Sequence, residues 1–246
     1  MKNIMFKSFN FRFSPSKVLF LSFLSTSSLV VTSPSHAITL NPSSWNSFGD
    51  VITSSNQVSL TNAFSEGFDD TENFNLSSND PLSGIDLEFE LGLPDFSLDP
   101  DPTNFVNATE GSAIKTTVTV KTGDVLSFNW NFLTNDSSFN PEGVGDYAFL
   151  QVNDTLVTLG DTNSSLGLSS TNFIQETGSQ NFSYTFSADG AYSLGLGIVD
   201  VIDTFNSSAL VVDNIQVKTK VKTPEPAIIF GLIISVGGLS LSKRRK

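Results

Sequence analysis

Cysteine is absent from the 246 residues, and the single histidine is His36. A chain without thiols forms no disulfides, so its fold must depend on a hydrophobic core, for which 22 phenylalanines are available. If residues 1–37 are a removable leader, as argued below, the remainder has neither His nor Cys. This excludes Ser-His-Asp and Cys-His nucleophilic catalysis. It also disfavours zinc and copper sites, which need imidazole or thiolate ligands.

Positive charge is scarce between the two ends of the chain. Residues 38–222 contain five lysines, no arginine and 24 of the 25 acidic residues, which gives this region a net charge of −19. Such a surface repels nucleic acid, because phosphate binding requires cationic side chains. It suits solubility outside the cell and the binding of hard cations such as calcium.

The N-terminal 37 residues have the layout of a secretory signal. The first 17 positions hold four basic and no acidic residues, and residues 18–31 are mostly apolar, with serine and threonine interruptions. Ser35, His36 and Ala37 then supply the small-x-small pattern that signal peptidase needs, which predicts cleavage after Ala37. The alternatives are an amphipathic surface helix or a membrane anchor, for which the apolar run is short.

Residues 223–246 form an equally ordered C-terminal segment. Pro224, Glu225 and Pro226 end any preceding strand, since proline lacks the backbone donor. Residues 227–242 carry no charge and, as a transmembrane helix, reach about 24 Å, slightly short of a hydrocarbon core of about 30 Å. The chain closes with a basic cluster of Lys243, Arg244, Arg245 and Lys246. Basic residues stay cytoplasmic, so we expect the body on the outer side of the inner membrane. A plain C-terminal anchor is the alternative.

This C-terminal arrangement resembles the PEP-CTERM sorting signal of Gram-negative bacteria, including cyanobacteria. The resemblance covers about 24 residues and is specific because the tripeptide, the apolar segment and the basic cluster occur in this order. It implies processing by an exosortase, a membrane-embedded cysteine protease-transpeptidase, and a final location at the cell surface or outside the cell.

Residues 38–222 have the length of one domain and read as strands and turns. Apolar and polar residues alternate, or apolar residues dominate, in four segments: 125–132, 147–152, 182–186 and 192–198. Asn153-Asp154 is a turn, and Asp189-Gly190 predicts a hairpin. Short strands at short intervals indicate an all-β antiparallel sandwich or barrel.

The body also resembles the jelly-roll-like domain of many uncharacterised cyanobacterial PEP-CTERM proteins. The residues that carry this resemblance are 45, 49–51, 108–114, 123–135, 190–195 and 211–214. It implies a jelly-roll-like sandwich and no established activity. Residues 85–91 alternate with period two, which favours a strand, whereas the resemblance implies a short helix; both readings stay open.

Five aspartates are candidate calcium ligands. Asp213, beside the last strand, is the first choice, because an aspartate at this place in galactose-binding-like jelly rolls often holds structural calcium. The further candidates are Asp200, Asp203, Asp136 and Asp146. Calcium takes six to eight oxygen ligands, which carboxylates and carbonyls supply. The competing interpretation of Asp213-Asn214 is a local turn or a side-chain-to-backbone bond, and that of Asp136 and Asp146, which share one loop, is a solvated loop.

Three functions compete. The first is a non-enzymatic surface or extracellular-matrix protein, structural or adhesive, with calcium supporting the fold. The second is a carbohydrate-binding module for exopolysaccharide, which needs an exposed aromatic or polar face; Trp130 is expected in the core, and Trp45 is undecided. The third, a glycosidase, needs two carboxylates facing each other about 5 to 10 Å apart.

Overall fold

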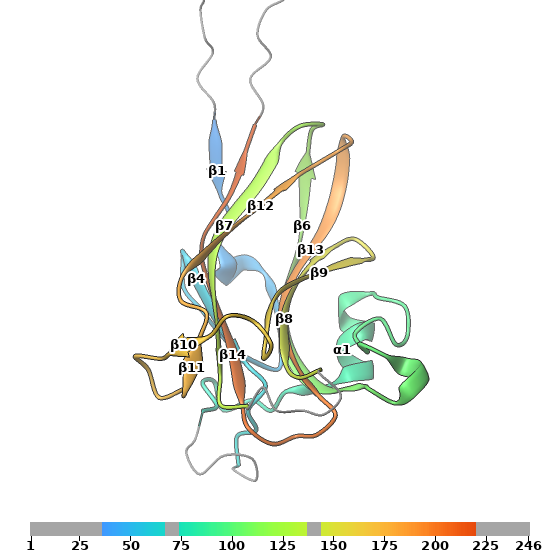
Figure 1. The fold of residues 1–246 in the computed structure, drawn as a ribbon. Coiled ribbons are helices and arrows are strands. Elements are labelled where there is room, and N and C mark those ends of the chain that lie inside the picture. The colour runs from blue at the N-terminus through green and yellow to red at the C-terminus, as the bar shows by residue number, and fades with distance from the viewer. Residues whose placement is uncertain (1–35, 67–73, 137–143, 220–246) are drawn as a thin grey trace, which may run out of the picture. The chain divides into compact units, whose positions relative to one another are not determined.

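The computed structural model describes residues 36–66, 74–136 and 144–219. These residues form two antiparallel sheets packed face to face (Figure 1). The all-β sandwich expected from the sequence is therefore confirmed. The predicted signal peptide and the predicted C-terminal sorting segment lie outside the described residues, apart from His36 and Ala37. Within the described residues no helix is long and apolar enough to span a membrane.

Sheet A has eight strands and sheet B has six. Sheet A consists of β1 (Ala37–Thr39), β3 (Asp50–Thr53), β4 (Gln57–Thr61), β7 (Val125–Thr134), β10 (Gly167–Leu168), β11 (Gln175–Glu176), β12 (Gln180–Thr185) and β14 (Ser208–Lys218). Sheet B consists of β2 (Asn46–Phe48), β5 (Leu82–Ser83), β6 (Ala108–Val120), β8 (Tyr147–Val152), β9 (Thr155–Asp161) and β13 (Gly190–Val201). The centre of sheet A runs β12, β7, β14 and β4, and the centre of sheet B runs β6, β13 and β8. Two 3-10 turns, η1 (Pro42–Ser44) and η2 (Pro102–Asn104), lie outside the sheets.

The main core fills the space between the sheets. Alternation along β7 directs Leu126, Phe128 and Phe132 inward, and all three are almost fully buried. Each buried side chain of this size contributes about 1.5–3 kcal/mol. Trp45 is 9% exposed and belongs to this core, and Trp130 is partly buried against it. The expectation for Trp130 is thus confirmed, and Trp45 is resolved as a core residue.

Residues 84–91 form a helix, α1 (Gly84–Leu91), so the strand reading of this segment is wrong. The Ser83 side chain accepts a hydrogen bond from the Asp86 N–H at the start, and Gly92 ends the helix in the left-handed conformation with φ 68°. Lys115 Nζ donates to the last carbonyls, at 2.6 Å from the Leu91 oxygen. These caps override the period-two pattern.

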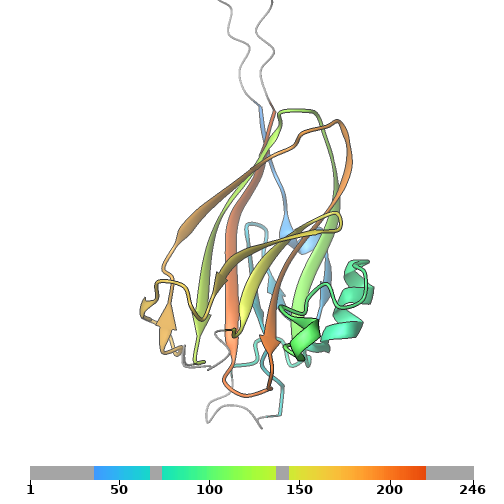
Figure 2. The same ribbon diagram turned by 45° about the vertical axis from the view of Figure 1, so that its right-hand side comes forward.

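A second core joins α1 to the outer face of sheet B. Figures 1 and 2 show α1 lying beside that sheet. Leu87 and Leu91, one helical turn apart, are buried there together with Phe149 of β8. The buried Glu88 accepts hydrogen bonds from the N–H groups of Phe96 and Leu98, at 2.8 and 2.7 Å. Sheet B therefore has both faces covered where α1 and residues 92–107 lie.

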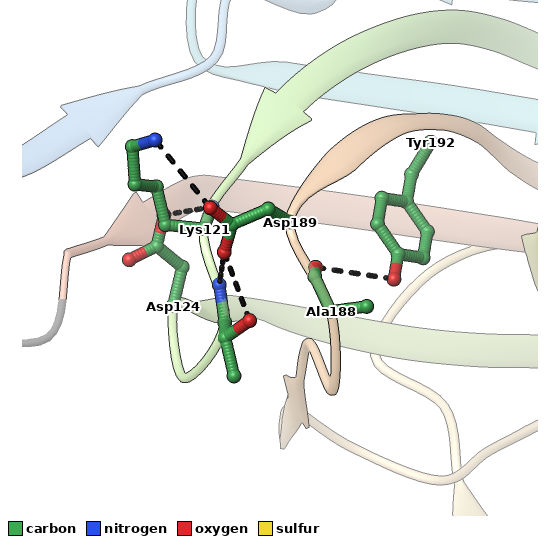
Figure 3. Close-up of polar contacts among 6 residues, drawn as sticks. Lys121, Asp124, Ala188, Asp189 and Tyr192 are labelled. Atoms are coloured by element: carbon green, nitrogen blue, oxygen red, sulfur yellow. Dashed lines mark hydrogen bonds and ion pairs between the residues drawn. The ribbon is translucent and has the colours of Figure 1, made fainter.

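The hairpin predicted at Asp189-Gly190 is wrong. Strand β12 pairs with β7 in sheet A, and β13 pairs with β6 and β8 in sheet B, so residues 186–189 cross from one sheet to the other. The β6–β7 turn crosses beside it. Asp189 accepts hydrogen bonds from the backbone N–H and hydroxyl of Thr122, at 2.7 and 2.8 Å, and pairs with Lys121 at 3.5 Å (Figure 3). Phe186, which is fully buried, draws the chain into the core before it turns.

Candidate functional site

The outer face of sheet A carries a row of polar side chains that crosses the strands. The register places Asn181 of β12 opposite Asn129 of β7, Asn129 opposite Asp213 of β14, and Asp213 opposite Gln57 of β4. Neighbouring strands lie about 4.8 Å apart, so the row repeats with that spacing. The inward residues of β7 fill the core, which leaves this alternate set directed away from it.

Hydrogen bonds connect the row. Asn181 Nδ2 donates to Asn129 Oδ1 at 3.1 Å, and Asn129 Nδ2 donates to Asp213 Oδ1 at 2.9 Å. Asn214, in the left-handed conformation at a bulge in β14, also donates to Asp213 Oδ1. The side chains are therefore held in fixed positions, and Asn181 and Asn214 remain exposed.

A second polar group continues the face next to this row. Asn131 Nδ2 donates to Glu176 Oε2 at 3.0 Å, and the Thr177 hydroxyl donates to Asn131 Oδ1 at 3.1 Å. Ser169 donates to the same Glu176 oxygen at 3.3 Å. Strands β7, β11, β12 and β14 thus share a surface of amides, hydroxyls and carboxylates, which we call the polar face.

Three of the predicted calcium ligands meet at one end of the sandwich, away from Asp213. Asp146 and Asp200 are each 2% exposed and hydrogen-bond to each other. Asn62 Nδ2 bridges them, at 3.1 Å from Asp146 Oδ2 and 3.3 Å from Asp200 Oδ2. The Ser208 hydroxyl donates to Asp146 Oδ2 at 2.6 Å. Asp136 is close enough for its charge to act on Asp146.

Burial gives this pair unusual proton affinity. Burial raises the pKa of Asp146 to about 7, against the lowering effect of its hydrogen bond from Ser208. Burial and the charges of Asp146 and Glu110 raise the pKa of Asp200 to about 12. Asp200 therefore keeps a proton at neutral pH and donates it to Asp146 in a hydrogen bond. A shared proton reduces the charge that the two buried carboxylates would otherwise carry.

Asp203 and Asp213 take no part in these hydrogen bonds, although the charge of Asp203 adds to the rise in the pKa of Asp200. Asp203 is exposed in the β13–β14 connection, where its backbone carbonyl accepts from Thr109 Oγ1 and its carboxylate from the Phe205 N–H. Asp213 belongs to the polar face. Within the three described ranges, no group of three or more His, Cys, Asp or Glu residues is arranged to hold a metal ion. Calcium binding stays a prediction.

Ala37, the predicted cleavage residue, begins β1 opposite Lys218 of β14. Cleavage after it would leave Ile38 and Thr39 of this strand. The predicted sorting residues, 224–226 and 243–246, lie outside the described residues.

Asp50 is a buried acceptor of several hydrogen bonds, and the sequence analysis did not name it as a candidate site residue. It is fully buried, and its carboxylate accepts from the N–H groups of Leu76 and Ser77, at 2.8 and 2.6 Å, and from the Thr61 hydroxyl. Only the Gly49-Asp50-Val51 resemblance pointed to it. It anchors the segment that follows β4 and has no solvent access for a ligand.

No protein-family model and no curated protein match this chain. Among solved structures, it is similar to a β-glucosidase from Kluyveromyces marxianus, at 14% identity and a TM-score of 0.27, over 65% of this chain and 17% of that chain. A structure described as "CBM4 structure and function" matches at 9% identity and a TM-score of 0.28, over 73% of this chain and 89% of that chain. The chain spans only 17% of the length of the glucosidase. Structural likeness at TM-scores this low does not indicate a function for this chain.

Proposed function

We propose that this chain is an exported, non-catalytic β-sandwich protein of the cell surface or extracellular matrix, and that it binds exopolysaccharide through the polar face. The observation that carries the proposal is the hydrogen-bonded row of Asn181, Asn129 and Asp213 on rigid neighbouring strands. The jelly-roll connectivity implied by the sequence resemblance is part of the same proposal.

The chemistry of the polar face matches a hydrated chain of sugars. Amides both donate and accept hydrogen bonds, and carboxylates accept two or more, so together they pair with hydroxyl groups of either role. Because strands hold the side chains at a regular spacing, little side-chain entropy remains to be lost on binding. A glycan that lies across the strands would meet the same types of group repeatedly.

The acid pair does not favour a glycosidase. Catalysis requires two carboxyl groups about 5 to 10 Å apart with sugar between them. Asp146 and Asp200, the two acids with strongly raised pKa values, contact each other and are shielded from solvent. This pair is therefore not placed to act on a glycosidic bond.

The test is affinity electrophoresis of the purified protein in gels containing the exopolysaccharide of the producing organism. We expect retardation by the polymer, and a double variant, Asn129→Ala with Asn181→Ala, should weaken binding about ten-fold, the scale of one or two lost hydrogen bonds. The control is Asn46→Ala on β2, an exposed residue of sheet B. Equal retardation of the wild type and the double variant contradicts the assignment of the site.

Delivery to the surface is the second part of the proposal, and the C-terminal resemblance supports it. The expected partners are signal peptidase, exosortase and, before processing, the inner membrane. Deletion of residues 224–246 should abolish surface delivery, measured by protease accessibility on intact cells. Unchanged delivery would refute the sorting role.

Calcium is a separable part of the proposal, supported by the acidity of residues 38–222. A specific site should raise the melting temperature at submillimolar calcium, since a ligand that binds only the folded state stabilises it. An unchanged melting temperature would contradict a specific calcium site, and the acidic residues would then serve only solubility.

A further inference from the structure

A cleft opens on the outer face of sheet B, where the cover formed by α1 and residues 92–107 gives way to β9. Its volume is about 350 Å³, within the range of small-molecule sites, and it is lined from both the cover and strands β8 and β9. This site is separate from the polar face, which belongs to sheet A.

The floor of the cleft is partly apolar and held in place. Tyr147 and Leu156 line it, and both pack against the second core. The Tyr147 hydroxyl donates to the Leu98 carbonyl at 2.6 Å, which fixes the ring. Burial, followed by the charge of Asp99, raises the pKa of Tyr147, so the ring stays neutral. A rigid aromatic and aliphatic floor suits the C–H face of a sugar ring.

Two carboxylates reach the same cleft from separate segments. Asp99 comes from the cover, and Asp161 ends β9 opposite Tyr147. Each carboxylate accepts hydrogen bonds at Oδ1. The Ala108 N–H donates to Asp99 at 2.9 Å, and the Asn163 N–H and the Ser164 hydroxyl donate to Asp161 at 2.9 and 3.0 Å. The lysines of the described ranges are 115, 121 and 218, and none lines the cleft.

Hydrogen-bonding groups complete the lining. Thr158 and Asn163 are exposed and add a hydroxyl and an amide beside the carboxylates. The cleft thus combines an apolar floor, neutral polar groups and two negative charges. Those are the complements of a ring with a C–H face, hydroxyl groups and an ammonium group.

We propose that this cleft binds a protonated amino sugar, a hexosamine with a free ammonium group. The ammonium pairs with Asp99 and Asp161, the hydroxyls bond to Thr158 and Asn163, and the ring lies on Tyr147 and Leu156. The inference rests on the cleft and does not depend on glycan binding at the polar face.

The test compares D-glucosamine with N-acetylglucosamine, its neutral relative, by saturation-transfer NMR and calorimetry on the purified full chain in mildly acidic buffer. Glucosamine should bind about five-fold more tightly, because partly exposed ion pairs contribute at this scale. Asp99→Asn and Asp161→Asn each keep the Oδ1 acceptor and should reduce this preference. Asp154→Asn, in the exposed β8–β9 turn, is the matched control and should preserve it.

Two further arms make the result decisive. Thr158→Trp should fill the cleft and abolish glucosamine binding in a protein with unchanged melting behaviour. Butylammonium, which has the charge but no ring, should bind more weakly than glucosamine. Equal binding of glucosamine and its acetylated relative, or a preference untouched by both Asn variants, overturns the proposal. Butylammonium binding as tight as glucosamine overturns the sugar assignment. Glucosamine binding that survives Asn129→Ala with Asn181→Ala separates this site from the polar face.

Discussion

At the scale of single residues, the Asp146–Asp200 pair makes stability depend on pH. An ordinary aspartate has a pKa of 3.8, whereas burial raises the pKa of Asp146 to about 7 and that of Asp200 to about 12. Above pH 3.8 the folded protein therefore keeps protons that the unfolded chain releases. Stability falls as pH rises wherever the native state binds more protons. The expected window runs from about pH 4 through neutrality.

Asp200→Asn should flatten this dependence. The amide keeps a donor toward Asp146 but removes one proton-binding group, and each retained proton contributes a slope of about 1.4 kcal/mol per pH unit. Urea unfolding between pH 5 and 8, in about half-unit steps, measures the slope. Asp154→Asn should leave it unchanged. A variant slope equal to that of the wild type would show that the pair does not retain protons in the folded state.

The opposite sign applies to exposed aspartates at low pH. Hydrogen bonds from the Thr122 backbone and hydroxyl lower the pKa of Asp189, so its contribution is present above pH 3.8 and is lost as the pH falls below that value. The two effects therefore occupy different pH windows.

Sequence alone identified Asp136, Asp146 and Asp200 as candidate calcium ligands, but it did not predict that Asp146 and Asp200 form a buried hydrogen-bonded pair. Their meeting depends on residues far apart in the chain, since Asn62 and Ser208 complete the cluster. No local pattern encodes contacts of that sequence separation. The pair is consequently explained by tertiary packing, and so is the burial of Asp50.

At the scale of elements, capping at both ends helps to stabilise α1. Gly92→Ala places a Cβ in the left-handed conformation, 3.3 Å from the Lys115 ammonium nitrogen. We expect a loss of about 1–2 kcal/mol in the free energy of unfolding, the cost of that conformation for an L-residue. Urea denaturation measures it. Gly167→Ala has no such φ and no neighbour within 4 Å of the added Cβ. A similar loss in both variants would contradict the role of Gly92.

Asp189 is expected to stabilise the two turns, β6–β7 and β12–β13, that cross between the sheets. Asp189→Ala removes the hydrogen bonds to Thr122 and the ion pair with Lys121 that join the two turns. The melting temperature should fall further than for Asp154→Ala, which removes a carboxylate from an ordinary turn. Scanning calorimetry at neutral pH compares them. Equal melting temperatures would mean that the crossings do not depend on this residue.

Strand positions were predictable because period two survives in β7, β12 and β13. Strand partners were not. Asp189-Gly190 has the composition of a hairpin turn. The burial of the flanking aromatic residues determines whether β12 and β13 pair with each other or lie in different sheets. Phe182 and Tyr184 pack in sheet A against the same core that Tyr192 contacts from sheet B.

At the scale of the whole molecule, two different surfaces face away from the core. Sheet A presents fixed amides and carboxylates, whereas α1 covers part of the outer face of sheet B and the cleft opens on that face beside β9. Composition predicted the acidity of residues 38–222 and their lack of His and Cys, and the alternation of apolar and polar residues predicted the strands. Neither could predict the row on sheet A, because that row depends on register across four strands.

The most direct test of polysaccharide binding is hydrogen–deuterium exchange of the purified protein with and without the exopolysaccharide of the producing organism. The polar face predicts new protection concentrated on β7, β12 and β14 and little change on β9. Protection confined to the loops at the ends of the sandwich, or none at a polymer concentration that retards the protein in gels, would contradict the account.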